Sequence, residues 1–204
     1  QGVELALAWA PIDRSDFKWN TIFTFSRNSN KLVKFSNEEF TNTYIDIGWI
    51  GGAIPLNSQR ITEGESLGTF FGPSWIGLDE NGYDTFENSN PIGKVNPEDW
   101  AAMGNAYPIF TIGWGNAFSY KKFDLNMNFR SNIGGKVLNF HRLYYENWQN
   151  IGTRNIVKTQ LETPEFIGNA IYSSKYVEDA TFLKLDNISL GYDLDVNNKY
   201  ILNN

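Results

Sequence analysis

The chain has 204 residues, of which 41% are hydrophobic, 20% charged and 16% aromatic, and its formal net charge is −6. This composition excludes a disordered chain, and the scattered Lys and Arg residues exclude nucleic acid as a partner, because phosphate binding needs clustered basic side chains. The absence of cysteine excludes disulfides, thiolate catalysis and Cys-based zinc sites. No stretch approaches the roughly 20 apolar residues of a membrane-spanning helix.

Two segments at the start of the chain alternate between apolar and polar side chains. In the first, one phase consists of Val3, Leu5, Leu7 and Trp9; in the second, it consists of Phe17, Trp19, Thr21, Phe23 and Phe25. A period of two residues is typical of β-strands. The sequence therefore predicts two strands here, joined by the short connection at residues 11–16.

Three segments carry signals for short helices. Asn96-Pro97-Glu98-Asp99 has a capping residue, a proline at the first position and acids in the first turn, and Gly104 is placed to end the helix. Residues of about 139–149 form a second candidate, and Thr163-Pro164-Glu165 resembles a third helix start. All three lie in long segments between predicted strands.

Alternation returns in the second half of the chain. Residues 109–119 read as a strand, and residues 123–130 alternate strictly between apolar and polar side chains. In residues 180–192, Leu183 and Leu185 fall on one phase, whereas Ile188, Leu190 and Tyr192 fall on the other. A β-bulge near Asp186 and Asn187 would bring the two phases to one face.

Strand length favours a membrane barrel over a soluble sandwich. Sandwich strands are usually about 5–6 residues long, whereas the segments here run to about 9–13 and membrane-spanning strands need about 9–11. Aromatic residues near the strand ends, such as Trp9, Phe17, Trp19 and Tyr120, are typical of an interfacial girdle. We predict an all-β fold: an antiparallel transmembrane β-barrel segment with long extracellular loops that contain short helices.

The lengths of the connections predict a further hairpin. Outer-membrane barrels place short turns on the periplasmic side and long loops outside. A single strand between Asn30 and Leu78 would leave the long connection at 79–108 on the periplasmic side. We therefore predict two strands, over about 52–62 and 67–78, joined by a tight turn at Glu63-Gly64-Glu65. Three long loops, from Asn30, Leu78 and Gly134, then share the outer face.

Several motifs carry a family resemblance. The stretch GNAYP at residues 104–108 leads into TIGWGNAFSYKKFDLNMNFRSNIGGKVLN at 111–139, and DATFLKLDNISLGYDL lies at 179–194. Together with residues 2–35 and 68–82, and in this order, these stretches resemble the signature hairpins of SusC/RagA-family TonB-dependent transporters.

The resemblance implies about seven or eight strands from the late wall of a barrel of about 22 strands, whose lumen holds a plug. Residues 1–204 are then expected to be a partial barrel domain, with the plug domain and closing strands outside the chain. The resemblance also implies an outer-membrane location in a Gram-negative bacterium, extracellular loops, coupling to TonB and a SusD-like lipoprotein over the mouth. The expected cargo is an oligosaccharide, with a peptide as the alternative, and no enzymatic activity is expected.

Six loop aromatics are the predicted ligand-binding residues, because sugar rings stack on aromatic faces: Trp49, Tyr83, Trp100, Tyr144, Tyr145 and Trp148. The alternative is that these rings hold the loops together or contact the lid protein. No catalytic residue is predicted, since His141 is the only histidine and has no recognisable triad partners.

No metal or cofactor is predicted either. The family's acidic, glycine-rich stretch is replaced at residues 89–99 by one with few acids. Residues 79–84 space their oxygens like a Ca²⁺ loop, but Asn90 stands where such a loop needs a bidentate glutamate, so a turn is predicted.

Two further classes of protein remain open from the residues alone. A soluble all-β carbohydrate-binding module or glycosidase domain would point Phe123, Leu125, Met127 and Phe129 into a closed core. The barrel would point the same four side chains outward to lipid. A purely structural surface protein would show no pore-lining face.

Overall fold

The computed structural model describes residues 1–51, 54–88, 96–162, 168 and 170–194. Within this part of the chain, thirteen strands form four sheets. The chain divides into two compact units, which we call the sheet unit and the loop unit. The sheet unit consists of residues 1–28, 109–133 and 181–204, and the loop unit consists of residues 29–108 and 134–180.

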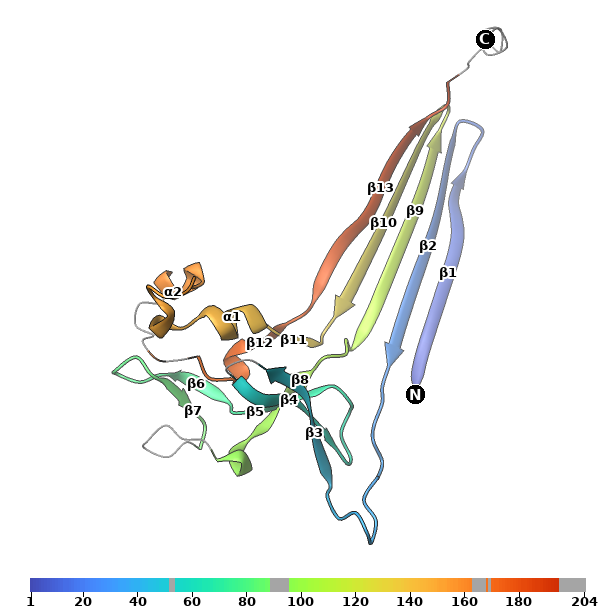
Figure 1. Ribbon diagram of the computed structural model, residues 1–204. Helices are drawn as coiled ribbons and strands as arrows, with labels where there is room; N and C mark the ends of the chain where they lie inside the picture. The colour runs from blue at the N-terminus through green and yellow to red at the C-terminus, as the bar shows by residue number, and fades with distance from the viewer. Residues whose placement is uncertain (52–53, 89–95, 163–167, 169, 195–204) are drawn as a thin grey trace, which may run out of the picture. The chain divides into compact units, whose positions relative to one another are not determined.

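The sheet unit is a five-stranded antiparallel sheet in the order β1-β2-β9-β10-β13 (Figure 1). Its strands are β1 Gly2–Asp13, β2 Phe17–Asn28, β9 Phe110–Tyr120, β10 Phe123–Ile133 and β13 Phe182–Tyr192. Each strand is therefore 11 or 12 residues long, which is the length that a tilted strand needs to cross a membrane. The strands predicted from alternation are all confirmed.

The predicted bulge in the last strand is also confirmed. Asn128 pairs with Asn187 and Phe129 pairs with Leu185, so Asp186 is the extra residue on β13. One additional residue reverses the phase of a strand. The two apolar phases of β13 consequently share one face of the sheet.

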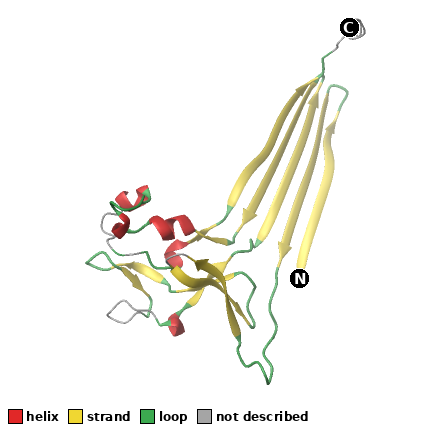
Figure 2. Ribbon diagram, in the orientation of Figure 1, coloured by secondary structure: helices red, strands yellow, loops and turns green. Residues whose placement is uncertain are grey.

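The loop unit contains three smaller sheets and several short helices (Figure 2). One sheet has four strands: β3 Tyr44–Gly51, β4 Ile54–Thr62, β5 Thr69–Gly72 and β8 Ala101–Asn105. The second is the pair of β6 Trp75–Leu78 and β7 Asp84–Phe86, and the third is the pair of β11 Lys136–Leu138 and β12 Val177–Asp179. Its helices are η1 Pro97–Asp99, α1 Phe140–Tyr145, η2 Trp148–Asn150, α2 Lys158–Glu162 and η3 Ser174–Tyr176. The buried core of this unit consists of Phe70, Leu143, Tyr172, Tyr176 and Val177.

The prediction of an additional hairpin in the long sheet, which is based on the lengths of the connections, is wrong. β2 pairs with β9 without interruption, from Phe17 opposite Tyr120 to Ser26 opposite Thr111. No strand fits between two strands that share one ladder, so β4 and β5 pair inside the loop unit instead. The described residues place five strands in the long sheet, where seven or eight were expected.

The long connections are accordingly two rather than three. One runs from β2 to β9 and the other from β10 to β13, and both leave the sheet at the end where Ser26, Thr111, Asn132 and Phe182 are paired. The short turns β1–β2 and β9–β10 lie at the opposite end (Figure 1). The turn at Glu63–Glu65 belongs to the first long connection, together with residues 79–108.

The three helix signals have different outcomes. Near residues 139–149, α1 begins after Asn139, whose side chain accepts a hydrogen bond from the Arg142 backbone N–H at 3.0 Å. After Asn96 there is only the single turn η1, because the residues up to Gly104 pair with β5 as a strand. The signal at 163–165 lies outside the described residues. No helix in the described part of the chain is long and apolar enough to span a membrane.

Candidate functional site

One face of the five-stranded sheet is apolar across all five strands. The register aligns rows of side chains, one of which is Leu7, Phe23, Trp114, Phe129 and Leu185. Every buried hydrophobic residue among those that the structure describes belongs to the loop unit, so no described core covers this face. A large uncovered apolar surface is suited to lipid rather than to water.

The four side chains that distinguish the barrel from a soluble domain lie on this apolar face. Phe123, Leu125, Met127 and Phe129 pair with apolar partners on β9 and β13, apart from Met127, which is opposite Asn116 on β9. Phe123 remains 48% exposed. The closed core that a soluble sandwich requires is therefore not formed around these residues in the described structure.

Aromatic rings gather on the apolar face near the short turns. The ring of Phe17 lies 6.4 Å from that of Tyr120, and Trp19 stacks on Phe118 at 5.7 Å. Phe123 is next to Tyr192 at 4.7 Å. This arrangement is that of an aromatic girdle at one edge of an apolar band.

Three buried polar residues interrupt the apolar face: Thr21, Asn116 and Ser131. Thr21 pairs with Asn116 across β2 and β9. The indole N–H of Trp19 donates to Asn116 Oδ1 at 3.0 Å, and that of Trp114 donates to Thr21 Oγ1 at 3.0 Å. An unsatisfied donor in hydrocarbon costs several kcal/mol. Thr21 and Asn116 therefore allow both indoles to lie on the apolar face with their N–H groups paired.

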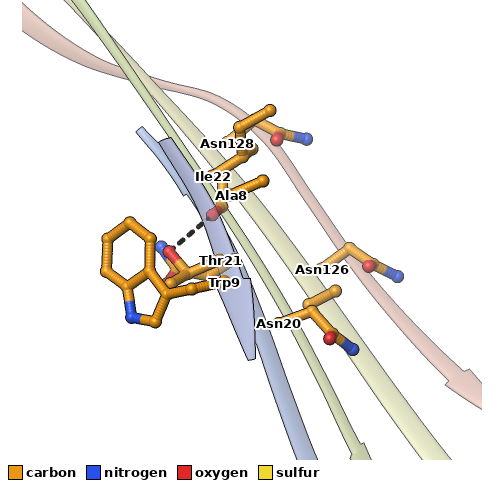
Figure 3. A pocket seen from close by; sticks show the side chains of 10 residues that line it. Ala8, Trp9, Asn20, Thr21, Ile22, Asn126 and Asn128 are labelled. Carbon is orange, nitrogen blue, oxygen red and sulfur yellow. Dashed lines mark hydrogen bonds between the residues drawn. The ribbon is translucent and has the colours of Figure 1, made fainter. Parts of the chain in front are cut away.

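The opposite face of the sheet is polar. Asn20, Asn126 and Asn128 project from it, on the side away from Trp9 (Figure 3). They line a shallow recess of about 340 Å³, together with small residues of β9. A Cβ added to Gly115 would lie 3.0 Å from Asn128 Oδ1, so glycine lets the amide lie close over the strand. The asparagine side chains beside the small residues of β9 can form hydrogen bonds with water.

Charges of both signs complete this polar face. Arg130 Nε lies 3.1 Å from Asp186 Oδ2, and Lys184 Nζ lies 3.5 Å from Asp186 Oδ1. The Ser119 hydroxyl donates to Asp124 Oδ1 at 2.7 Å. Such exposed pairs contribute only about 0–1 kcal/mol each. Their importance is that they make this face suitable for water, as the lining of a pore requires.

A buried ion pair holds the β6–β7 hairpin in the loop unit. Lys175 Nζ lies 3.1 Å from Asp84 Oδ1, and their side chains are only 9% and 1% exposed. The Trp75 indole N–H donates to the same oxygen at 2.8 Å, and the Trp75 backbone N–H donates to Ser174 Oγ at 2.9 Å. The hairpin and η3 are thereby fixed to each other.

The predicted turn at residues 79–84 is confirmed. Asp79 Oδ1 accepts from the backbone N–H groups of Asn81 and Tyr83, at 2.9 and 2.8 Å. This is an Asx turn at the tip of β6–β7. Among the residues that the structure describes, no three His, Asp or Glu side chains are grouped as metal ligands.

A second charge cluster lies around α1. Arg142 Nη1 is 2.7 Å from Glu178 Oε1, and Arg142 Nε is 3.2 Å from Glu146 Oε2. Burial opposes the ionisation of Glu178, but the hydrogen bonds from Arg142 and Asn139 outweigh it and hold the pKa of Glu178 below its usual value. Burial raises the pKa of Tyr176, and the nearby Glu146 carboxylate raises it further. The lowered pKa favours the ionised form of Glu178, and the raised pKa favours the neutral phenol of Tyr176.

Two of the six predicted ligand aromatics, Tyr144 and Tyr145, are in contact, and a third follows them in the chain. Tyr144 meets Tyr145 edge-on with ring centres 5.3 Å apart, and Trp148 follows in η2. Tyr145 also stacks on His141 at 5.6 Å, and Tyr144 stacks on Phe140 at 5.7 Å. The end of α1 is thus an aromatic cluster with two stacked pairs.

The other three predicted aromatics lie on separate elements. Trp49 is exposed on β3, and Tyr83 is exposed at the tip of β6–β7. Trp100 follows η1, and its indole nitrogen is buried without a partner among the described residues. No ring contact in the described structure joins these three residues to the α1 cluster or to one another.

The sequence reasoning missed three polar residues beside Tyr144. Asn147, Asn150 and Arg154 line a cavity of about 220 Å³ with it. These residues lie in consecutive turns, where no periodicity marks them. The only local signal is the succession of amide and guanidinium side chains after an aromatic helix.

Glu63 fastens another part of the loop unit. Its Oε1 accepts from the backbone N–H groups of Phe35 and Ser36, at 2.8 and 2.6 Å. The hydrogen bonds from Ser36 and Phe35 lower the pKa of Glu63 from its usual 4.5. A lowered pKa means that the contact stabilises this loop above pH 4.5 and is lost as the pH falls through the lowered value.

Replacing Glu63 with Gln is expected to speed amide hydrogen exchange at Phe35 and Ser36 already at neutral pH, because the charge-assisted acceptor is removed. In the unsubstituted protein, the same two amides are expected to lose protection only below about pH 4.5, after correction for the intrinsic exchange rate. Glu65→Gln, two residues along the turn, is the control and is expected to leave both amides protected. Equal effects of the two substitutions would contradict the role of Glu63.

The comparisons with known proteins agree with this geometry. The chain is 29% identical to TonB-dependent receptor P3 of Formosa agariphila, over 95% of the chain and 21% of that protein. It is 24% identical to TonB-dependent receptor SusC of Bacteroides thetaiotaomicron, over 94% of the chain and 20% of that protein. The chain thus spans about a fifth of the length of these relatives. No family model matches it.

Solved structures show the same fold. The RagAB peptide importer in its closed-closed state superposes with a TM-score of 0.74 at 18% identity, over 94% of this chain and 22% of that one. A long antiparallel sheet with one apolar and one polar face is the arrangement of strands in an outer-membrane β-barrel. The chain is SusC/RagA-like, and over most of its length it corresponds to a segment of a TonB-dependent transporter.

Proposed function

We propose that this chain forms part of the wall and the extracellular mouth of an outer-membrane importer. The sorting of side chains by the cross-strand register supports this most directly: the apolar rows face one way and the amides and charges face the other. Both long connections leave from one end of the sheet, which suits a barrel with its loops outside. On this proposal, residues 1–204 belong to the barrel domain, and the plug domain and closing strands belong to the remainder of the transporter.

We further propose oligosaccharides as the cargo, with TonB as the energy source and a SusD-like lipoprotein as the partner at the outer face. The relative named SusC supports the choice of partner system. The exposed rings of Trp49 and Tyr83 and the clustered rings at the end of α1 support sugar binding, because aromatic faces stack on sugar rings. RagAB, whose fold is similar, is a peptide importer, so peptide is the alternative cargo.

Growth of the source bacterium on defined nutrients tests the cargo. A strain without the full-length gene is expected to lose growth on one class of oligosaccharide and to keep growth on peptides, and loss of TonB is expected to give the same defect. Complementation with a Trp49→Ala, Tyr83→Ala double variant is expected to restore protein in the outer membrane but to slow oligosaccharide uptake. The matched control is Tyr120→Ala in the aromatic girdle, which is expected to leave uptake unchanged. A defect limited to peptides would replace oligosaccharide with peptide as the cargo.

A further inference from the structure

The loop unit contains a small cavity with one polar wall and one apolar wall. It has a volume of about 220 Å³. The apolar wall consists of Leu143, Ile54 and Ala170, and the remaining side chains are Tyr144, Asn147, Asn150 and Arg154. Ligand pockets for drug-sized molecules are about 300–1,000 Å³. A cavity below that range fits one terminal unit of a chain, such as a single sugar ring, rather than an oligomer.

Arg154 differs from the other arginines of the loop unit. Arg60 is bound to Asp46 through Nε at 2.6 Å and Nη2 at 3.1 Å, and Arg142 is bound to both Glu146 and Glu178. The described residues offer Arg154 no carboxylate within ion-pair distance. A guanidinium presents planar paired donors that match a carboxylate in a bidentate geometry. Among the described residues, no carboxylate therefore neutralises the guanidinium at this site.

The backbone keeps the polar wall together. The Arg154 backbone N–H donates to the Asn150 carbonyl at 2.8 Å, and the Asn150 N–H donates to the Asn147 carbonyl at 3.1 Å. Two successive turns thereby bring two amides and a guanidinium to one side of the cavity. The Tyr144 ring on the adjoining wall is held by its stack on Phe140 and by the edge of Tyr145. The backbone and the Tyr144 ring are therefore fixed before a ligand binds, and a ligand has to order the exposed Arg154 side chain.

We infer that this cavity is a subsite for a carboxylate-bearing terminal unit of the transported chain. Arg154 binds the carboxylate, the two asparagines bind neighbouring hydroxyl or amide groups, and Tyr144 covers one face of the unit. The inference rests on the proposed import function. A uronic acid at the end of an oligosaccharide and the C-terminus of a peptide share this chemistry.

Titration calorimetry on the full-length transporter in detergent, with its lipoprotein partner, tests the subsite. One arm compares an oligosaccharide ending in a uronic acid with the same oligosaccharide ending in the neutral sugar. The other arm compares a peptide that has a free C-terminus with its C-terminal amide. In the arm that matches the cargo, the acid is expected to bind roughly tenfold or more tightly than its neutral partner, as a charge-assisted bidentate contact allows.

Arg154→Gln is expected to abolish this preference, so that the acid and its neutral partner bind with equal affinity. Arg14→Gln, in the short turn of the sheet unit, is the matched control and is expected to preserve the preference. A preference that survives in Arg154→Gln, or no preference in either arm, overturns the subsite. In both of those cases, continued binding or uptake of the neutral ligand shows that the proposed import function stands, whereas loss of all binding and uptake counts against that function itself.

Discussion

Met127→Lys in the full-length transporter is expected to destabilise the folded barrel by about 2–4 kcal/mol, the cost of a lysine on a lipid face near the bilayer midplane. Met127 lies in the central part of β10, in a row with Asn116 and Ile188 on the apolar face. Asn128→Lys, one residue later, places the same charge on the polar face. It is expected to change the free energy of unfolding by less than about 1 kcal/mol, because the charge meets water there.

Reversible urea unfolding from lipid vesicles measures both values, and heat-modifiable migration in SDS gels gives an independent readout of barrel formation. Each variant adds one lysine. A difference between their free energies of unfolding therefore reports which face of the sheet the lysine is on. Equal destabilisation by the two substitutions would contradict the assignment of the two faces.

Lys175→Met is expected to destabilise the loop unit by about 3–5 kcal/mol, since it leaves Asp84 buried without its cation. The side chain of Asp84 is 1% exposed, so water cannot replace the lost partner. Removing both charges with Lys175→Met and Asp84→Leu is expected to recover part of this loss, because a buried pair replaced by apolar groups is often close to neutral, whereas the Trp75 indole N–H loses its acceptor. Hydrogen exchange over residues 75–86 and 172–177 measures the change.

Lys158→Met is the control for this prediction. Lys158 Nζ lies 3.3 Å from Glu162 Oε1, but its side chain is 86% exposed. An exposed pair of this kind contributes about 0–1 kcal/mol. If Lys158→Met and Lys175→Met had equal effects on exchange, burial would not be the source of the stabilisation by the Lys175 pair.

The alternation of apolar and polar residues predicts the sheet unit well, because within each long strand it identifies the apolar face without reference to other strands. The phase change between Leu185 and Ile188 was sufficient to predict a bulge, and Asp186 is the bulged residue. Pattern failed where pairing is decided by distant residues. β4 and β5 show strand-like sequences, but only the ladder between β2 and β9 reveals that they lie outside the wall.

The same limit applies to the helix after Asn96 and to the site. The turn η1 begins after Asn96 with Pro97 at its first position, but the Asn96 side chain makes no capping hydrogen bond, and the pairing of β8 with β5 takes over after one turn. Asp84 and Lys175 are far apart in the sequence, and neither is marked by any motif. Aromatic composition identified Tyr144, Tyr145 and Trp148 as candidates, whereas the polar groups beside them become neighbours only through the turns of the loop unit.

The uninterrupted ladder between β2 and β9 makes these strands a hairpin whose turn has been replaced by a folded insertion. Loop-closure entropy grows only slowly with length, by about 0.6 kcal/mol for each doubling. A long insertion is therefore compatible with the wall at modest cost, and here it folds together with the β10–β13 connection, because the core joins Phe70 of the insertion to Leu143, Tyr172, Tyr176 and Val177 of that connection. The register between β2 and β9 does not depend on the length of the insertion, so the two long connections can change together while the pairing of the sheet stays the same.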